Sequence, residues 1–330
     1  MYEPTVNGTV TSGITLDLVV EVQGRFERAS IDATGHLLLW NGREIVMVRD
    51  GEVERSARSS DTHEIRGAAL SPAGRRAVLE VERGGSGALR VDDLPTPRAT
   101  AVLARLTLDV VTLDICWADE EHVWLAGIDA ESGDARLSLV HVSDDRVVAS
   151  TQFAVPFADD ELRFATADAN GCSFNMHAGQ HGSWAYAATR RDGSLSVALW
   201  IDGAGGQLET AEGKVLALIE RGLTRVGRAP ALDLSAHGWP LDLVQADPGR
   251  VVVGFDQGDS LILVDSLGMR ALEVVQLPSP RPVRAVTKLL AHPGGGFVAV
   301  ATGGTLSKPS TSVYRGRAID AGARGTGAAR

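Results

Sequence analysis

Three side chains with metal-binding chemistry lie within ten residues of one another in the segment ANGCSFNMHAGQHGSWAYAA, which begins at Ala169. Cys172 precedes His177 and His181, and the two histidines are four residues apart. On a helix this spacing would place both imidazoles on one face, where they could bind zinc together with a thiolate. The first question is therefore whether the segment forms such a helix.

The glycines of the segment argue against a helix. Gly179 and Gly182 flank His181, and glycine is a poor helix former. The residues before them predict a strand, in which Cys172 and His177 point to opposite faces because side chains alternate. His181 then falls in the following turn. We expect core packing and an exposed turn histidine here, not a zinc site.

The amino-acid composition bears on whether the protein is globular and on whether it binds nucleic acid. The 330 residues are 44% hydrophobic and 22% charged, which is typical of a globular protein. The net charge is −10 and the isoelectric point is near 5.3. An acidic chain argues against contact with a phosphate backbone as the main function, so we expect no nucleic acid partner. Arginine greatly outnumbers lysine, which indicates GC-rich codons and favours a bacterial source.

The cysteine count and the N-terminus bear on the compartment. Two cysteines, Cys116 and Cys172, do not make a disulfide framework and suit a reducing compartment. The start MYEPTVNGTVTSG has neither the basic residues nor the apolar run of a signal peptide. No stretch approaches the roughly 18 apolar residues of a membrane helix. The sequence therefore predicts a cytoplasmic protein without a membrane anchor.

A repeating unit of short strands and tight turns runs through the chain. Its clearest copy, IRGAALSPAGRRAVLEVERGGSGALRVDD from Ile65 to Asp93, reads as three strands separated by two glycine-containing turns. The turn after the first strand recurs with a mean spacing of about 43 residues, close to the 40–45 residues of a four-stranded propeller blade. We place that turn at Gly35, Gly74, Glu121, Gly171, Gly213, Gly249 and Gly295.

Each unit divides into four strands. In one unit the expected strands are Leu162–Asp168, Cys172–His177, Ser183–Arg190 and Ser194–Asp202. Helical periodicity is nearly absent. The segment Ala211–Arg225 could form a short helix, but its position favours strand, turn and strand.

The two ends of the repeat complement each other. The last unit lacks one strand, whereas Ile14–Val22 is a strand without a unit of its own. We expect this N-terminal strand to complete the last blade and close the ring, because an open array leaves sheet edges exposed. The predicted organisation is an N-terminal arm at residues 1–13, a propeller at 14–314 and a flexible tail at 315–330.

In period and strand pattern the chain resembles a WD-repeat-type β-propeller of the bacterial kind, over about residues 14–314. The aromatic residues that end strands in LLLWNG (Leu37–Gly42) and ALWIDG (Ala198–Gly203) carry the resemblance, although neither is a true Trp-Asp pair. The resemblance implies a propeller fold and a tendency to bind proteins. Together with the seven turns above, it leads us to expect an all-β single propeller of seven four-stranded blades. The alternative is a ring of six blades with an insertion near residues 203–240.

Four aspartates lie on or near the predicted innermost strands. Six-bladed lactonase-like propellers hold calcium with carboxylates that converge on the axis, as a hard cation requires. The same chemistry is an alternative here, and it would make the protein a metal-dependent hydrolase. The four aspartates lie at different depths along their strands, which favours a turn-capping role instead. The four are Asp32, Asp114, Asp168 and Asp242.

One face of a propeller gathers the loops between blades and those between the second and third strands of each blade. Tryptophan and arginine, which are over-represented in binding hot spots, occur in these loops. Acidic and basic residues segregate along the predicted face. The candidate partner-binding residues are Trp239, His237, Arg281, Arg284, Lys308, Asp159, Asp160 and Glu161.

These residues predict a non-catalytic protein-binding scaffold, a subunit of a bacterial multi-protein system. No catalytic residue or cofactor is assigned. The hydrolase is the alternative, and a nucleic-acid-associated scaffold is a third class, disfavoured by the acidic charge.

Overall fold

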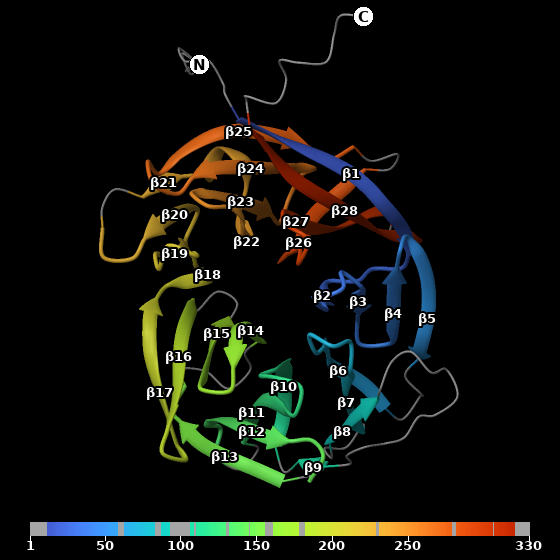
Figure 1. The fold of residues 1–330 in the computed structure, drawn as a ribbon, viewed down its shortest axis with the longest axis vertical. Coiled ribbons are helices and arrows are strands. Elements are labelled where there is room, and N and C mark those ends of the chain that lie inside the picture. The colour runs from blue at the N-terminus through green and yellow to red at the C-terminus, as the bar shows by residue number, and fades with distance from the viewer. Residues whose placement is uncertain are drawn as a thin grey trace, which may run out of the picture.

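The computed structural model describes residues 12–58, 63–82, 87–92, 106–108, 110–129, 132–144, 146–155, 161–177, 182–228, 231–278, 282–305 and 307–320. The described strands pair into seven four-stranded antiparallel sheets that follow one another around a ring (Figure 1). In six of them the strand order is the chain order, with the first strand innermost and the fourth outermost. The predicted all-β propeller is confirmed.

The first three sheets cover the N-terminal part of the ring. One contains β2 (Arg28–Ile31), β3 (Leu37–Trp40), β4 (Glu44–Arg49) and β5 (Glu52–Arg58). The next contains β6 (His63–Leu70), β7 (Arg76–Glu82), β8 (Gly87–Asp92) and β9 (Leu106–Leu108). The third contains β10 (Val110–Trp117), β11 (His122–Asp129), β12 (Ala135–His141) and β13 (Arg146–Phe153).

Three more sheets continue the ring. One contains β14 (Glu161–Asp168), β15 (Gly171–His177), β16 (Ser183–Arg191) and β17 (Ser194–Asp202), close to the predicted bounds. The next contains β18 (Ala204–Glu209), β19 (Val215–Ile219), β20 (Gly222–Arg225) and β21 (Leu232–Asp233). The sixth contains β22 (Pro240–Asp247), β23 (Arg250–Phe255), β24 (Ser260–Asp265) and β25 (Arg270–Gln276).

Residues 211–225 confirm the preference for strands over a helix, since they contain β19, a two-residue turn and β20. Within the described residues the only helical element is a short 3₁₀ turn, η2 (Ser235–His237), just before β22. No helix in this part of the chain is long and apolar enough to cross a bilayer.

The last sheet joins the two ends of the chain. It contains β26 (Val283–Ala291), β27 (Phe297–Thr305), β28 (Lys308–Asp320) and, as its outermost strand, β1 (Ser12–Gln23). β1 pairs antiparallel with β28 from Ser12 opposite Asp320 to Gln23 opposite Ser310. The expected closure by the N-terminal strand is thus present. The paired strands reach beyond the predicted bounds of the propeller, because the long β1 offers partners to β28 as far as Asp320.

The chain leaves β1 through a tight corner that is tied to β28. The Thr311 hydroxyl accepts a hydrogen bond from the Phe26 N–H and donates one to the Gly24 carbonyl, both at 2.9 Å. Gly24 has φ of +119°, and a Cβ there would lie 2.9 Å from the Phe26 ring. Glycine is therefore required for the corner that delivers the chain from the last sheet to the first.

The hydrophobic core lies between neighbouring sheets. One buried cluster joins Trp124 and Leu139 of the third sheet to Phe174 and Met176 of the fourth. Another packs β22–β25 against β26–β28, and it includes Ile14 of β1. Because each sheet is covered on both sides, the middle strands are apolar almost throughout, as in the buried run of β3.

The closure predicts different costs for two valines of β1. Val22 is 2% exposed and packs in the core, whereas Val19 lies at a bulge and is 40% exposed. Val22→Ala should lower the free energy of unfolding by about 2 kcal/mol. Val19→Ala, the matched control, should change it by less than about 0.5 kcal/mol. Denaturant unfolding of both variants measures the difference, and equal effects would contradict this account of the closure.

Candidate functional site: the loop face around Trp239

Trp239 is an exposed aromatic side chain on a firmly held backbone. It lies between η2 and β22, and 46% of it is exposed. The backbone N–H of Trp239 donates to Asp256 Oδ1 at 3.0 Å, and the backbone N–H of Asp256 donates back to the Trp239 carbonyl at 2.9 Å. Asp256 lies in the turn between β23 and β24. These hydrogen bonds therefore fix the connection between the sheets β18–β21 and β22–β25 to a turn of the latter.

Arg221 covers the ring of Trp239 from the preceding sheet. Its guanidinium carbon lies 5.5 Å from the ring centroid, within the range of a cation–π interaction. Arg221 belongs to the turn between β19 and β20, where Glu220 adopts φ of +54°. The Arg221 carbonyl accepts a hydrogen bond from the Leu234 N–H at 2.9 Å, which holds the turn against the segment before Trp239.

Three further candidate residues lie on the same face. His237 is half-buried, with its ring 5.9 Å from that of Phe255. Arg284 is exposed at the start of β26, and its carbonyl accepts a hydrogen bond from the Gly258 N–H at 3.1 Å. Lys308 is exposed at the start of β28. Their loops join sheets, or join second to third strands, so alternating strand direction brings them to one end of the ring.

Trp239, His237, Arg284 and Lys308 thus all lie at one end of the ring, and their role in binding a partner stays a prediction. Arg281, Asp159 and Asp160 lie outside the described residues, as does the side chain of Glu161, so the acidic part of the predicted face stays a prediction. Sequence reasoning missed Arg221. The signal was present, because a strand–turn–strand interpretation of residues 211–225 puts its turn among the loops of this face.

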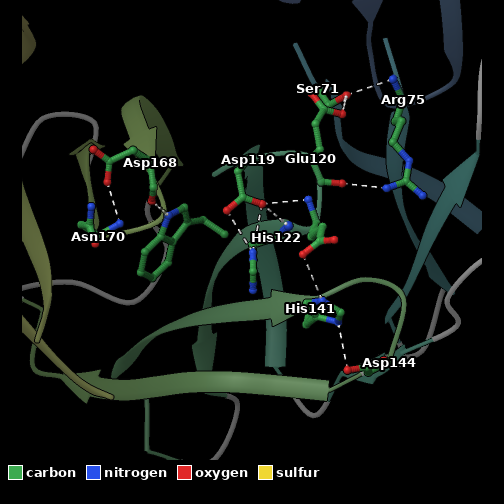
Figure 2. A network of polar contacts seen from close by, with 11 residues as sticks. Ser71, Arg75, Asp119, Glu120, His122, His141, Asp144, Asp168 and Asn170 are labelled. Atoms are coloured by element: carbon green, nitrogen blue, oxygen red, sulfur yellow. Dashed lines mark hydrogen bonds and ion pairs between the residues drawn. The ribbon is translucent and has the colours of Figure 1, made fainter. Parts of the chain in front are cut away.

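Two of the four predicted channel aspartates cap turns. Asp32 Oδ1 accepts hydrogen bonds from the Thr34 and His36 N–H groups, both at 2.9 Å. Asp168 Oδ1 accepts from the Asn170 N–H at 2.7 Å, in the turn seen in Figure 2. Both lie where a first strand ends, so they are at the end of the ring opposite Trp239.

The other two aspartates connect innermost strands of neighbouring sheets. Asp114 lies next to a bulge of β10 and accepts a hydrogen bond from the Phe164 N–H of β14 at 3.0 Å. Asp242 lies next to a bulge of β22 and accepts from the Leu289 N–H of β26 at 2.8 Å. The bulge interrupts regular pairing, which frees the carboxylate to reach the next sheet.

Both connecting carboxylates also meet a cation. Asp114 Oδ2 lies 3.5 Å from Arg28 of β2, and Asp242 Oδ2 lies 3.1 Å from Lys288 Nζ. Burial raises the pKa of Asp114, and the Arg28 charge only partly offsets this rise. Among the described residues no three His, Cys, Asp or Glu side chains are grouped so as to hold a metal ion. No three of the four aspartates are therefore grouped at one point.

The cysteine–histidine segment is also not brought together as a metal site. Cys172 and His177 both lie on β15 and, five residues apart, point to opposite faces as expected. His177 Nδ1 is 2.8 Å from the Ser183 hydroxyl. Burial raises the pKa of the Cys172 thiol, and it raises that of Cys116 to about 12. Both thiols are thus protonated at neutral pH and are poor ligands or nucleophiles. His181 lies outside the described residues.

A polar network that the sequence did not reveal occupies the opposite end of the ring (Figure 2). Glu120 Oε2 accepts from the Ser71 hydroxyl at 2.7 Å, and the Glu120 carbonyl accepts from Arg75 Nη1 at 2.7 Å. These bonds tie the third sheet to the second. Beside them, the His122 and His141 rings meet edge to face at 5.0 Å.

Carboxylates flank both histidines of this network. Asp119 Oδ1 lies 2.9 Å from His122 Nδ1, and Asp144 Oδ2 lies 3.2 Å from His141 Nδ1. Burial raises the pKa of Asp119, but hydrogen bonds from the Glu121 N–H and from His122 outweigh it, so the pKa is lowered overall. These contacts fix the turns at this end of the ring.

Comparison with known proteins supports the fold and nothing narrower. No family model and no curated protein matches the sequence. Among solved structures, the β-propeller domain of Cps50 (Swd1) from Myceliophteria thermophila aligns with a TM-score of 0.60 at 12% identity, covering 91% of this chain and 99% of that chain.

Two further solved structures align almost equally well, although their names describe different kinds of protein. A chain of the mitotic checkpoint complex aligns with a TM-score of 0.59 at 10% identity, over 96% of this chain and 95% of that one. A streptogramin B lyase aligns with a TM-score of 0.58 at 9% identity, over 91% and 97%. The protein is therefore a β-propeller, similar in fold both to propellers of protein complexes and to a lyase. At these identities the fold does not choose between them.

The position of Asp114 predicts a pH-dependent effect. Asp114→Asn keeps an oxygen acceptor for the Phe164 N–H but removes the buried charge. Burial raises the pKa of Asp114 above 3.8 in the folded protein, so the folded state favours the protonated carboxyl. The free energy of unfolding of the wild type, relative to that of Asp114→Asn, should therefore be highest below pH 3.8. It should fall as the pH rises through the folded-state pKa of Asp114. Denaturant unfolding from pH 3.5 to 8 measures this difference.

Asp114→Ala is the control, because it removes the acceptor as well. It should lose about 1–3 kcal/mol relative to Asp114→Asn throughout the pH range. A wild type that gains stability over Asp114→Asn as pH rises would contradict the assignment.

Proposed function

We propose that this protein is a non-catalytic protein-binding scaffold that engages its partner through the loop face around Trp239. The observation that carries the proposal is the exposed Trp239 ring, stacked by Arg221 and held on backbone hydrogen bonds to a neighbouring turn. Tryptophan and arginine dominate binding hot spots, and a preorganised site costs little ordering entropy on binding.

The proposal extends to the setting of the protein. We place it in the bacterial cytoplasm as a subunit of a multi-protein system with protein partners and no cofactor. The composition, the two reduced cysteines and the acidic charge support this placement. That a propeller of similar fold occurs in a mitotic checkpoint complex is consistent with such a role, at the level of the fold alone.

We also propose that the ring has seven blades. The count depends on the sheet β18–β21, whose outermost strand has only two residues. A six-bladed interpretation treats this segment as an insertion. Its Leu216, Leu218 and Leu223 pack in one buried cluster with β22–β24, as a blade does, which supports the higher count.

Loss of the Trp239 side chain and reversal of the charge at Arg284 should weaken partner binding without unfolding the ring. The double variant Trp239→Ala with Arg284→Glu removes the exposed ring and inverts a charge beside it. The partner is first recovered from the source organism by affinity purification on the wild type and identified by mass spectrometry. Calorimetric titration of that purified partner should then show at least a roughly 30-fold weaker Kd, equivalent to about 2 kcal/mol.

The matched control places the same kinds of change on the opposite face. Leu267→Ala with Arg191→Glu also removes an exposed apolar side chain and reverses an exposed arginine, in turns between third and fourth strands. Its Kd should equal that of the wild type. Thermal unfolding curves should show that both double variants are folded. Equal affinity of the two folded variants for the partner would disprove the proposed face.

A further inference from the structure

We propose that the loop face recognises an acidic segment of its partner through four exposed side chains of that face, Trp239, Arg221, Arg284 and Lys308, here called the Trp239 patch. This inference rests on the proposed function and specifies the chemistry of the partner. It is carried by three exposed cations without ion pairs, and by the way Arg221 lies over Trp239.

The cations of the patch form no ion pair with another side chain in the described part of the protein. Within the described residues, the side chains of Arg221, Arg284 and Lys308 are exposed and make no ion pair. Basic side chains elsewhere commonly do pair, although the protein has a net charge of −10. Examples are Arg55 with Glu44, Arg250 with Asp247, Arg270 with Asp265 and Lys288 with Asp242.

A carboxylate beside Trp239 is bound to the backbone. Asp256 Oδ1 accepts the Trp239 N–H at 3.0 Å, so this carboxylate fixes the loop rather than pairing with Arg221 or Arg284. Glu220 and Asp259 are exposed on the same face but form no ion pair with the patch. The three cations therefore remain available to a carboxylate that arrives with the partner.

The stacking of Arg221 on Trp239 leaves both groups able to bind. A guanidinium uses its planar face for a cation–π contact, while its N–H groups point outward in the plane and can donate to a carboxylate in a bidentate manner. The exposed part of the indole offers an apolar surface at the same place. The patch is thus suited to a short segment that presents an acidic residue beside an apolar one.

An acidic peptide fits this patch better than a nucleic acid does. Sequence-tolerant binding of a single strand requires a basic groove that tracks the backbone and several aromatic rings for successive bases. The patch has three cations and one exposed tryptophan, on a protein whose overall charge repels a long polyanion.

The test uses labelled synthetic peptides with the full-length protein. The first has twelve residues, with glutamates and aspartates around a central leucine, and the second replaces every acid by its amide. Fluorescence anisotropy should give a Kd of about 1 mM or tighter for the acidic peptide at 50 mM salt. The amide peptide should bind at least tenfold more weakly, and 200 mM salt should weaken only the acidic one.

Variants assign the binding to the patch. Arg221→Glu and Arg284→Glu should each weaken the acidic peptide at least tenfold, whereas Arg191→Glu, an exposed arginine at the other end of the ring, should leave it unchanged. Equal binding of acidic and amide peptides, or an unchanged Kd in both patch variants, would overturn the inference. So would tighter binding of a twelve-nucleotide single-stranded DNA than of the acidic peptide.

The outcome also separates this inference from the proposed function. If the natural partner is lost in the Trp239→Ala, Arg284→Glu double variant but the acidic peptide does not bind, the scaffold stands and its acidic specificity is wrong. If the acidic peptide binds the patch but the double variant keeps its natural partner, the patch recognises acidic segments and the proposed partner face is wrong.

Discussion

The pairing of β1 with β28 is the contact on which the rest of the ring depends. A row of sheets packed face to face has two ends, and each end exposes an apolar sheet face to water. Joining the ends covers both faces at once, and here the join is made by the strand that comes first in the chain. Its register spans Ser12 to Gln23, so a long ladder of backbone hydrogen bonds stabilises the closure. The first and last sheets thereby become neighbours like any others.

Inside the closed ring, polar side chains act as connectors between sheets. Asp114 and Asp242 lie next to bulges of innermost strands, and each carboxylate accepts a hydrogen bond from a backbone N–H on the innermost strand of the next sheet. A buried carboxylate costs free energy, but it supplies the acceptor that this N–H needs and meets a cation beside it. This is why aspartates near the axis, which resemble metal ligands in the sequence, have a structural explanation here. At the other end of the ring, Glu120 performs a similar connection between the third and second sheets.

The features that the sequence predicted are those with local causes. Turn residues recur at blade spacing, short strands alternate around them, and the unpaired Ile14–Val22 implies closure, so period and strand bounds follow from neighbouring residues. Cys172 and His177 were likewise assigned to opposite faces of one strand from alternation alone. The missed features depend on residues from different sheets. The Arg221 stack, the Asp114 link to β14 and the Glu120 link to Ser71 each require knowledge of which side chains meet between neighbouring sheets, and the strand pattern does not contain it.

Contacts between sheets and contacts within the loops are made by different residues, and this explains where binding can evolve in this fold. The core between sheets and the connectors near the axis are satisfied within the ring, so a change there costs stability. The loops around Trp239 are fixed by backbone hydrogen bonds, such as those between Trp239 and Asp256 and from Gly258 to Arg284. Backbone bonds hold a loop in place whatever side chains it carries, apart from residues such as Asp256 that themselves take part. The side chains of Trp239, Arg221 and Arg284 are thus presented by a rigid frame that does not need them, which is the arrangement that the proposed partner binding requires.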